Sequence, residues 1–305
     1  MKQKKILVTH NGSFHTDDVF ACAALELYLE MRGEEWEVKR TRDEEIIASA
    51  DYVVDVGGVY NKDKNRFDHH QHGGAGKHVS MSGEPGIDYS SFGLVWEKFG
   101  EELAGASAAA KLIENNLVSP IDAFDNGIDL VENKHKVSPY YLQHIFFALR
   151  PAWNESTNID EIFLRAVELA KEILGREIIQ TKSLLEAKDR MSVIYKNSKD
   201  KRILILDKHY TDEIEAGDFP ETLFFIYPRK SDGLWGVKCA RVGLRTFQNK
   251  KSLPESWAGL RDEALARTSG VMDAVFCHRG RYFCVAKSQG GAIKLAELAL
   301  ENGIR

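Results

Sequence analysis

The chain has 305 residues and a formal net charge of −5 at pH 7, and 43% of its residues are hydrophobic. These values are typical of a globular protein of about two domains and argue against a disordered or collagen-like chain. No apolar run approaches the roughly 20 residues of a membrane-spanning helix, so neither a membrane protein nor a membrane partner is expected. The chain begins with a strand-like segment that lacks a signal-peptide core, and we therefore expect a cytoplasmic protein.

The cysteines give no sign of a disulfide framework or of a zinc site. Cys22, Cys239, Cys277 and Cys284 form no Cys-x-x-Cys pair. A chain of this length does not need disulfides for stability, so we interpret the four residues as buried thiols in a reducing compartment. For the same reason, zinc bound through sulfur is not expected.

Charge is distributed unevenly along the chain. Residues 1–227 carry a net charge of −12, whereas residues 228–294 contain 13 Lys and Arg against five Asp and Glu, a net charge of +8. An acidic body with one basic segment is compatible with a local anion-binding surface, and ordinary scatter of surface charge is the alternative. No block is basic enough to predict tight, sequence-independent binding to duplex nucleic acid.

The first 135 residues alternate strand-like and helix-like segments. Strands are predicted at residues 6–9, 36–40 and 52–56, and helices at residues 17–31, 91–99, 106–115 and 120–131. Between them, residues 61–86 form a polar, glycine-rich stretch that is too long for an idle connection in a compact domain. Strands that alternate with helices predict an α/β domain with a parallel sheet.

The rest of the chain divides into a helical part and a second α/β part. Residues 140–198 read as almost entirely helical, so residues 136–200 are interpreted as a helical connector. Short strands are then predicted at residues 203–206, 223–227, 235–239, 274–277 and 282–286, before a final helix at residues 292–302. Residues 201–305 are therefore predicted to form a smaller α/β domain, with the active site in the cleft between the two domains.

Four polar clusters of the first domain each follow an apolar strand or lie on a helix face. One cluster covers residues 10–18, Asp55 ends another strand, and further clusters cover residues 66–72 and 121–127. In open α/β sheets, ligands bind at the carboxyl ends of the strands. Imidazole and carboxylate without thiolate suit manganese, iron or zinc, and many oxygen ligands favour manganese. We predict two divalent cations, with Asp55 as a bridging ligand at the separation of about 3.5–4 Å that two-metal hydrolases use.

Each residue taken alone has an ordinary structural explanation. A single histidine at a strand end is usually only hydrogen-bonded, and Asp17 or Asp122 can cap a helix. Asp122 and Asp125 are three apart and share one helix face, so only one of them need be a ligand. His72 and His78 lie in the glycine-rich stretch and are interpreted as solvated. The metal-site hypothesis depends on the coincidence of all four clusters.

These motifs resemble the DHH phosphoesterase superfamily, which includes RecJ-type exonucleases and the manganese-dependent inorganic pyrophosphatases. The likeness is carried by the His and Asp residues after the first strand, by Asp55 and by Asp68-His69-His70. More closely, the chain resembles the melanocyte-proliferating-gene family, described as metal-dependent hydrolases or exonucleases. The matching stretches cover nearly the whole chain, at residues 9–18, 54–58, 66–71, 90–96, 122–127, 252–263 and 278–279.

The resemblance implies a set of ligands and catalytic residues. His10 and Asp55 would bind one ion, and Asp17, Asp55, His69 and one of Asp122 and Asp125 would bind the other. Many superfamily members have Asp where this chain has His15, so His15 would be a neutral ligand that leaves the site more positive. His70 would face the phosphate, which makes Asp55 and His70 the predicted catalytic residues.

The implied activity is that of a metal-dependent phosphoesterase, a 3′-5′ exonuclease on single-stranded RNA or short oligonucleotides that uses a water activated by two metal ions, Mn²⁺ above others. Arg261, His278 and Arg279 would bind substrate phosphate, although a solvated hairpin tip also explains the last two. The alternatives are hydrolysis of small nucleotides or another small phosphoester, hydrolysis of an ester or amide, and a non-catalytic metal-binding regulatory protein. The oligomeric state stays open, with a homodimer among the options.

Overall fold

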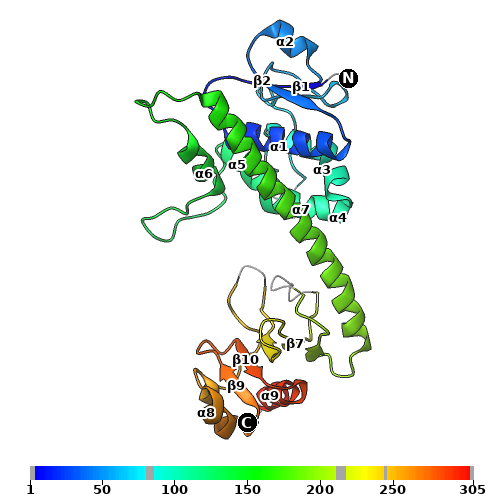
Figure 1. Ribbon diagram of the computed structural model, residues 1–305, viewed down its shortest axis with the longest axis vertical. Coiled ribbons are helices and arrows are strands. Elements are labelled where there is room, and N and C mark those ends of the chain that lie inside the picture. The colour runs from blue at the N-terminus through cyan, green and yellow to red at the C-terminus, as the bar shows by residue number, and fades with distance from the viewer. Residues whose placement is uncertain (1–3, 80–85, 211–217, 244–245, 303–305) are drawn as a thin grey trace. The chain divides into compact units, whose positions relative to one another are not determined.

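The computed structural model describes residues 4–79, 86–210, 218–243 and 246–302. Contacts divide the chain into two compact units, Met1–Lys182 and Ser183–Arg305. The boundary lies inside α7 (Ile159–Asn197), a helix of 39 residues, so the predicted helical connector is shared between the two units. Each unit contains one five-stranded sheet (Figure 1). The chain is therefore an α/β protein with two sheets, as predicted.

The first unit is built on a mainly parallel sheet in the order β2-β1-β3-β5-β4. Its strands are β1 (Lys5–Thr9), β2 (Trp36–Arg40), β3 (Tyr52–Val54), β4 (Tyr60–Asn61) and β5 (Arg66–Phe67). The first four strands in this order are parallel to one another, and β4 is antiparallel to β5. The parallel sheet was predicted, but β4 and β5 lie in the stretch interpreted as a loop, because two residues are too few to show a strand period. Residues 80–85 of that stretch lie outside the described ranges.

Helices cover both faces of this sheet. Ile6 and Val8 of β1 and Val53 of β3 pack with Ile47 of α2 (Glu44–Ser49), a short helix that was not predicted. The side chains between them along the strands point to the opposite face, which α1 (Thr16–Met31) and α3 (Ser91–Ala104) cover. Figure 1 shows α2 on one side of β1 and β2, and α1 on the other. The carboxyl ends of the strands thus lie beside the first turn of α1.

The remaining helices of the first unit follow one another closely. They are α4 (Ser107–Ile113), a π-helical segment (Glu114–Val118), α5 (Ser119–Asp125) and α6 (Leu142–Leu149). The helix predicted at residues 120–131 ends at Asp125, because Gly127 adopts a left-handed backbone conformation with φ +68°. Asp125 is therefore the last residue of a helix and can point out from its end. In the described ranges, no helix combines the length and the apolar character that a membrane span requires.

The second unit contains a mixed sheet in the order β6-β7-β8-β10-β9. Its strands are β6 (Ile203–Ile205), β7 (Phe224–Pro228), β8 (Trp235–Cys239), β9 (Ala274–Cys277) and β10 (Phe283–Ala286). The pair β6 and β7 is parallel, and the other pairs are antiparallel. Two helices accompany the sheet, α8 (Asp262–Ser269) and α9 (Gln289–Glu301). The sequence predicted all five strands and α9 but missed α8, which has only two buried apolar residues.

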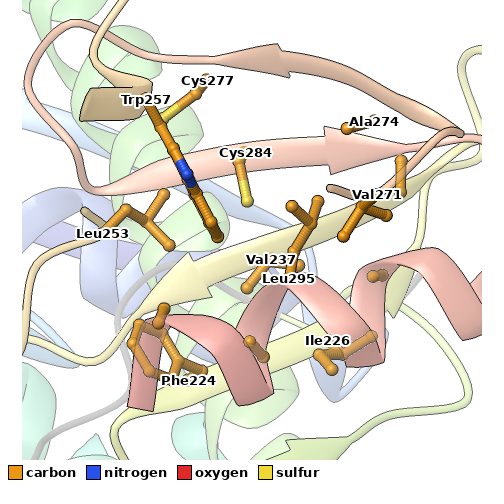
Figure 2. Close-up of a cluster of buried hydrophobic side chains, with 14 of the residues drawn as sticks. Phe224, Ile226, Val237, Leu253, Trp257, Val271, Ala274, Cys277, Cys284 and Leu295 are labelled. Carbon is orange, nitrogen blue, oxygen red and sulfur yellow. The ribbon is translucent and has the colours of Figure 1, made fainter. Parts of the chain in front are cut away.

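One face of this sheet forms the core of the second unit. Figure 2 shows Phe224, Ile226 and Val237 directed toward Leu295 of α9, with Trp257 at one end of the cluster. Trp257 is 4% exposed, so its indole stabilises the unit. All four cysteines of the chain are buried free thiols, as predicted.

Candidate metal centre

Three strand ends, one helix start and one helix end meet in the first unit. His10 follows β1, Asp55 follows β3, and residues 68–70 follow β5. Because these strands are parallel and adjacent, their carboxyl ends lie at one edge of the sheet. The first turn of α1 brings Asp17 to this edge, and the last residue of α5 brings Asp125.

The ligand atoms in this region form three overlapping groups, and the atoms of each group lie within 4.8 Å of one another. The groups are His10, His15 and Asp55; Asp55, His69 and His70; and His15, Asp17 and Asp125. Asp55 and His15 each belong to two groups. Nitrogen and oxygen donors at such separations have the composition and span of a divalent metal site.

Asp55 occupies the centre of the cluster. Its Oδ2 lies 3.2 Å from Nε2 of His10, and its Oδ1 lies 3.4 Å from Nε2 of His69. The Oγ of Ser91, in the first turn of α3, donates a hydrogen bond of 3.1 Å to the same Oδ1. Burial alone would raise the pKa of Asp55, but the contacts with His10 and His69 outweigh it and lower the pKa. Asp55 is therefore ionised, and its φ of 54° is a strained backbone conformation of the kind found at functional sites.

Asp18 was not among the predicted site residues, yet it contacts one of them. Its Oδ2 lies 3.1 Å from Nε2 of His10, and its Oδ1 accepts a hydrogen bond of 2.9 Å from the backbone N–H of His15, at the start of α1. Burial would lower the pKa of His10, but the hydrogen bonds with Asp18 and Asp55 raise it to about 10. Asp18 therefore has two roles: one carboxylate oxygen caps α1, and the other orients His10. An acidic residue at the third position of a helix is the capping signal that could have identified it.

Asp17 shows most directly that the cluster suits a cation. The residue is 1% exposed, and neither of its carboxylate oxygens has a hydrogen-bond donor. Burial and the neighbouring carboxylates of Asp55 and Asp125 hold the pKa of Asp17 well above its usual range. A buried carboxyl group without a donor is costly, and a divalent cation satisfies such a group. The donor set therefore fits metal ions.

The two histidines after β5 have different surroundings. Nε2 of His69 lies 3.4 Å from Oδ1 of Asp55 and 3.4 Å from Oδ2 of Asp125, but makes no well-directed hydrogen bond. The side chain of His70 is 62% exposed, and its Nδ1 lies 2.9 Å from Oδ1 of Asp68. Oδ2 of Asp68 accepts a hydrogen bond of 2.6 Å from the backbone N–H of Gly58. His69 thus lies within the cluster, whereas His70 stands at its rim with a fixed ring.

Asp122 lies outside the three groups and has other partners. Its Oδ1 accepts hydrogen bonds from Oγ of Ser90 at 2.5 Å and from the N–H of Gly93 at 3.2 Å. Its Oδ2 lies 2.7 Å from Nε2 of His78, whose Nδ1 lies 2.9 Å from Oε1 of Glu114. His78 is 6% exposed, so its interpretation as a solvated residue was wrong. Of the two aspartates on α5, only Asp125 joins the cluster.

The cluster lies between two hollows of the first unit. His15, Asp55 and His70 line both. One hollow has a volume of about 290 Å³ and is closed by α5 and α6, through Ile121, Phe124, Gln143 and Phe147. The other has a volume of about 560 Å³ and is lined by His10, Asn11, Ser13, Arg42, Gly57 and Gly58. The cluster can therefore be approached from two sides.

The predicted phosphate-binding residues lie on neighbouring segments of the second unit. Arg261 precedes α8, and its guanidinium lies 4.5 Å from the ring centroid of Phe276. Nδ1 of His278 accepts a hydrogen bond of 2.9 Å from the N–H of Gly280, and Arg279 is exposed beside it. Substrate binding by Arg261, His278 and Arg279 and the cleft between the two domains stay predictions.

The fold and the cluster define a class of protein, an α/β protein with a metal-type centre of histidines and aspartates at its strand ends. The family model described as "Uncharacterised protein family (UPF0160)", with the short name MYG1_exonuc, matches residues 6–300. The protein named MYG1 exonuclease from Bos taurus is 33% identical over 323 residues, which cover 96% of this chain and 84% of the relative. The chain therefore belongs to the MYG1 exonuclease family and is a hydrolytic enzyme, which confirms the resemblance to the melanocyte-proliferating-gene family.

Two solved structures show a weaker likeness. CDC45 from Entamoeba histolytica matches 97% of this chain and 95% of its own, with 9% identity and a TM-score of 0.30. The exonuclease RecJ bound to manganese matches 98% of this chain and 91% of its own, with 12% identity and a TM-score of 0.27. TM-scores of this size do not establish a shared fold.

Proposed function

We propose that the protein is a metal-dependent phosphodiesterase that removes nucleotides from the 3′ end of single-stranded RNA or short oligonucleotides. One observation carries the proposal: seven His and Asp side chains from five segments of the first unit form overlapping groups of ligand atoms, with Asp55 in two of the groups and the buried carboxyl group of Asp17 in the third. The relatives named exonucleases support nucleic acid as the substrate class.

We assign the residues of the cluster to two ligand sets that share Asp55, as the family resemblance implies. His10, His15 and Asp55 would hold one divalent cation, and Asp17, Asp55, His69 and Asp125 would hold the other. The number of carboxylates favours Mn²⁺. When bound, the ions supply a water molecule of lowered pKa and neutralise charge on the phosphoryl oxygens.

His70 is the side chain that would act on the substrate. Its ring is exposed at the rim of the cluster. Asp68 contacts Nδ1, and because the ring is rigid this contact also fixes the direction of Nε2. A histidine held in this way can donate a hydrogen bond to a non-bridging phosphate oxygen, or donate a proton to the leaving oxygen. Gly58 in turn fixes Asp68, which keeps the ring in place while the substrate changes.

The smaller hollow supports removal of a single terminal nucleotide. Its volume of about 290 Å³ is at the lower limit of ordinary ligand pockets. Its wall contains Phe124 and Phe147, whose rings pack edge to face against each other, with the Arg150 guanidinium 4.0 Å from the centroid of Phe147. Stacking of a base on an aromatic side chain contributes about 1–3 kcal/mol and tolerates any sequence. We propose that this hollow receives the terminal nucleoside, while the rest of the strand leaves on the other side of the metal centre.

Product mapping tests the proposal. The protein is purified without chelators, its metal content is measured, and RNA and DNA of one sequence, labelled at the 5′ or the 3′ end, are incubated with and without added Mn²⁺. We expect a metal-dependent ladder from the 5′-labelled strand and immediate release of a labelled mononucleotide from the 3′-labelled strand.

Asp55→Asn is the matched variant for this experiment, because it removes the shared carboxylate charge and keeps the side-chain volume. We expect it to lose most of the activity and to bind less metal. Full metal-dependent turnover by this variant would contradict the proposal, as would a wild-type protein that cleaves only mononucleotides. Shortening from the 5′ end would contradict the polarity alone.

A further inference from the structure

The larger hollow beside the metal centre continues into a second one within the first unit. The first hollow, of about 560 Å³, contains His10, Asp55 and His70 in its wall. The second has a volume of about 700 Å³ and lies between α2 and the segment around β4 and β5. Arg42, Val56 and Gly57 line both hollows, so the two adjoin and form one groove. We call this the Arg42 groove.

Gly57, which lines both hollows of the groove, has a backbone conformation that requires glycine. Gly57 has a φ of +93°, a conformation that favours glycine, and a Cβ at this position would lie 3.3 Å from Cγ2 of Ile47. Any other residue would therefore be strained and would press on α2. Glycine at this position therefore avoids backbone strain and a close contact with α2 where the two hollows adjoin.

Two cations of the groove have free side chains. Arg42 and Lys64 are exposed, and neither side chain makes a hydrogen bond or an ion pair within the described part of the chain. Arg66, in contrast, donates hydrogen bonds to the backbone oxygens of Ala48 and Ala50 and so fixes the end of α2. Glu44 is the one carboxylate that lines the second hollow. The groove therefore offers two cations to an anionic ligand.

The second hollow also has an apolar part in its wall. Ile47, Ala48, Val56 and Val59 line the second hollow, and Val59 is 50% exposed. A repeating ligand with both charged and apolar parts matches such a surface. In single-stranded nucleic acid, phosphates suit arginine and lysine, while sugars and bases provide apolar faces. A free mononucleotide would fill one hollow and leave the other empty.

We propose that the Arg42 groove binds the nucleotides of a single strand on the 5′ side of the scissile phosphate, with Arg42 near the next phosphate on that side and Lys64 at a more distant one. This inference rests on the proposed function, because it assumes a phosphodiester at the metal centre. It makes an oligonucleotide of several residues, rather than a small nucleotide, the preferred substrate. Arg42 lines both hollows and Lys64 only the second, so their effects depend on the length of the strand.

The test compares a dinucleotide with a ten-nucleotide RNA on the full-length protein with Mn²⁺. KM is measured for the wild type, Arg42→Ala, Lys64→Ala and the double variant, with Arg176→Ala as the control. Arg176 is exposed on α7 in the first unit and lines neither hollow. Melting temperatures of all variants show that each is folded.

We expect Lys64→Ala to raise KM for the ten-nucleotide RNA roughly tenfold more than KM for the dinucleotide, the usual loss for one charge-assisted contact. Arg42→Ala should likewise raise KM mainly for the ten-nucleotide RNA, because the only phosphate of a dinucleotide is the scissile one and none is left for Arg42 to contact. Each lost phosphate contact should reduce the slope of log KM against log salt concentration by about 0.7. Arg176→Ala should change neither KM value.

Equal losses on both substrates, or no loss on either, would overturn the inference while leaving the proposed function intact. A wild-type protein without turnover on any phosphodiester would refute the proposed function instead. In that case, fluorescence anisotropy with a labelled ten-nucleotide RNA still decides the inference. Binding that weakens in Arg42→Ala and Lys64→Ala but not in Arg176→Ala supports the groove, and absent or unchanged binding overturns it.

Discussion

Nε2 of His78 lies 2.7 Å from Oδ2 of Asp122, and both side chains are buried. This pair joins the segment after the DHH motif to α5, the helix that ends in Asp125. Glu114 contacts the other nitrogen of His78, and Ser90 donates to the other oxygen of Asp122, so the network also includes the start of α3. Asp122 therefore anchors α5, and the anchor determines where Asp125 lies.

Loss of charge at the two aspartates of α5 should affect different properties: stability for Asp122 and metal binding for Asp125. Asp122→Asn leaves a buried histidine without one of its two carboxylates, and we expect it to lower the free energy of unfolding of the metal-free protein by about 1–3 kcal/mol. Asp125→Asn should cost little stability and weaken Mn²⁺ binding, because Asp125 belongs to the cluster. Urea denaturation and calorimetric titration with Mn²⁺ measure the two effects. The reverse pattern would identify Asp122 as the ligand.

The stability that His78 contributes should depend on pH. Burial would lower the pKa of His78, but hydrogen bonds with Asp122 and Glu114 outweigh it and raise the pKa. Burial also raises the pKa of Asp122, so the pair competes for one proton, and the second carboxylate, Glu114, favours charge on the histidine.

A pKa that is higher in the folded than in the unfolded state gives stability that is complete below the unfolded value of about 6.5 and is lost as pH rises through the folded value. We therefore expect the difference in unfolding free energy between the wild type and His78→Gln to be larger at pH 5.5 than at pH 9. Urea denaturation of both proteins at the two pH values measures it, and a difference that grows with pH would contradict this assignment.

The sequence predicted the part of the site that depends on strand ends. His10 and Asp55 follow apolar runs, and parallel strands bring such positions together whatever the details of packing. His69 follows no apolar run, and only its place in Asp68-His69-His70 singled it out. The sequence could not show which of Asp122 and Asp125 belongs to the metal cluster, because a spacing of three puts both on the same helix face. Tertiary contacts decide it, through Ser90 and His78 from distant segments.

The errors of the sequence interpretation have physical causes. His78 lies in a glycine-rich stretch that has no period, so nothing in its neighbourhood signals that the side chain is 6% exposed. The strands β4 and β5 and the helix α2 are too short to show periodicity. Asp18 escaped attention because Asp17 beside it has the same chemistry, and only the geometry of the first helical turn separates their roles.

Two adjacent serines at the start of α3 provide a matched pair of variants. Oγ of Ser91 donates a hydrogen bond to Asp55, and Oγ of Ser90 donates one to Asp122. We expect Ser91→Ala to weaken Mn²⁺ binding several-fold with little change in stability, since it frees the shared ligand. Ser90→Ala should lower the unfolding free energy by about 1–2 kcal/mol and affect metal binding less. If both variants changed metal binding equally, the separation of the two networks would be wrong.

Asp17 should stabilise the protein only when metal is bound. Burial and the carboxylates of Asp55 and Asp125 hold the pKa of Asp17 well above its usual range, so its ionised form is costly in the metal-free protein, and a neutral amide avoids that cost. We expect Asp17→Asn to melt at a higher temperature than the wild type in EDTA. With Mn²⁺ the order should reverse, because ligand at about 100 times its dissociation constant stabilises the wild type by about 2.7 kcal/mol.

Differential scanning calorimetry of both proteins, with EDTA and with Mn²⁺, measures this crossing of melting temperatures. Arg176→Ala controls for a change of charge on the surface, and it should respond to Mn²⁺ as the wild type does. A metal-free Asp17→Asn protein less stable than the wild type would show that Asp17 has a structural partner. An unchanged response of this variant to Mn²⁺ would show that the cation lies elsewhere in the cluster.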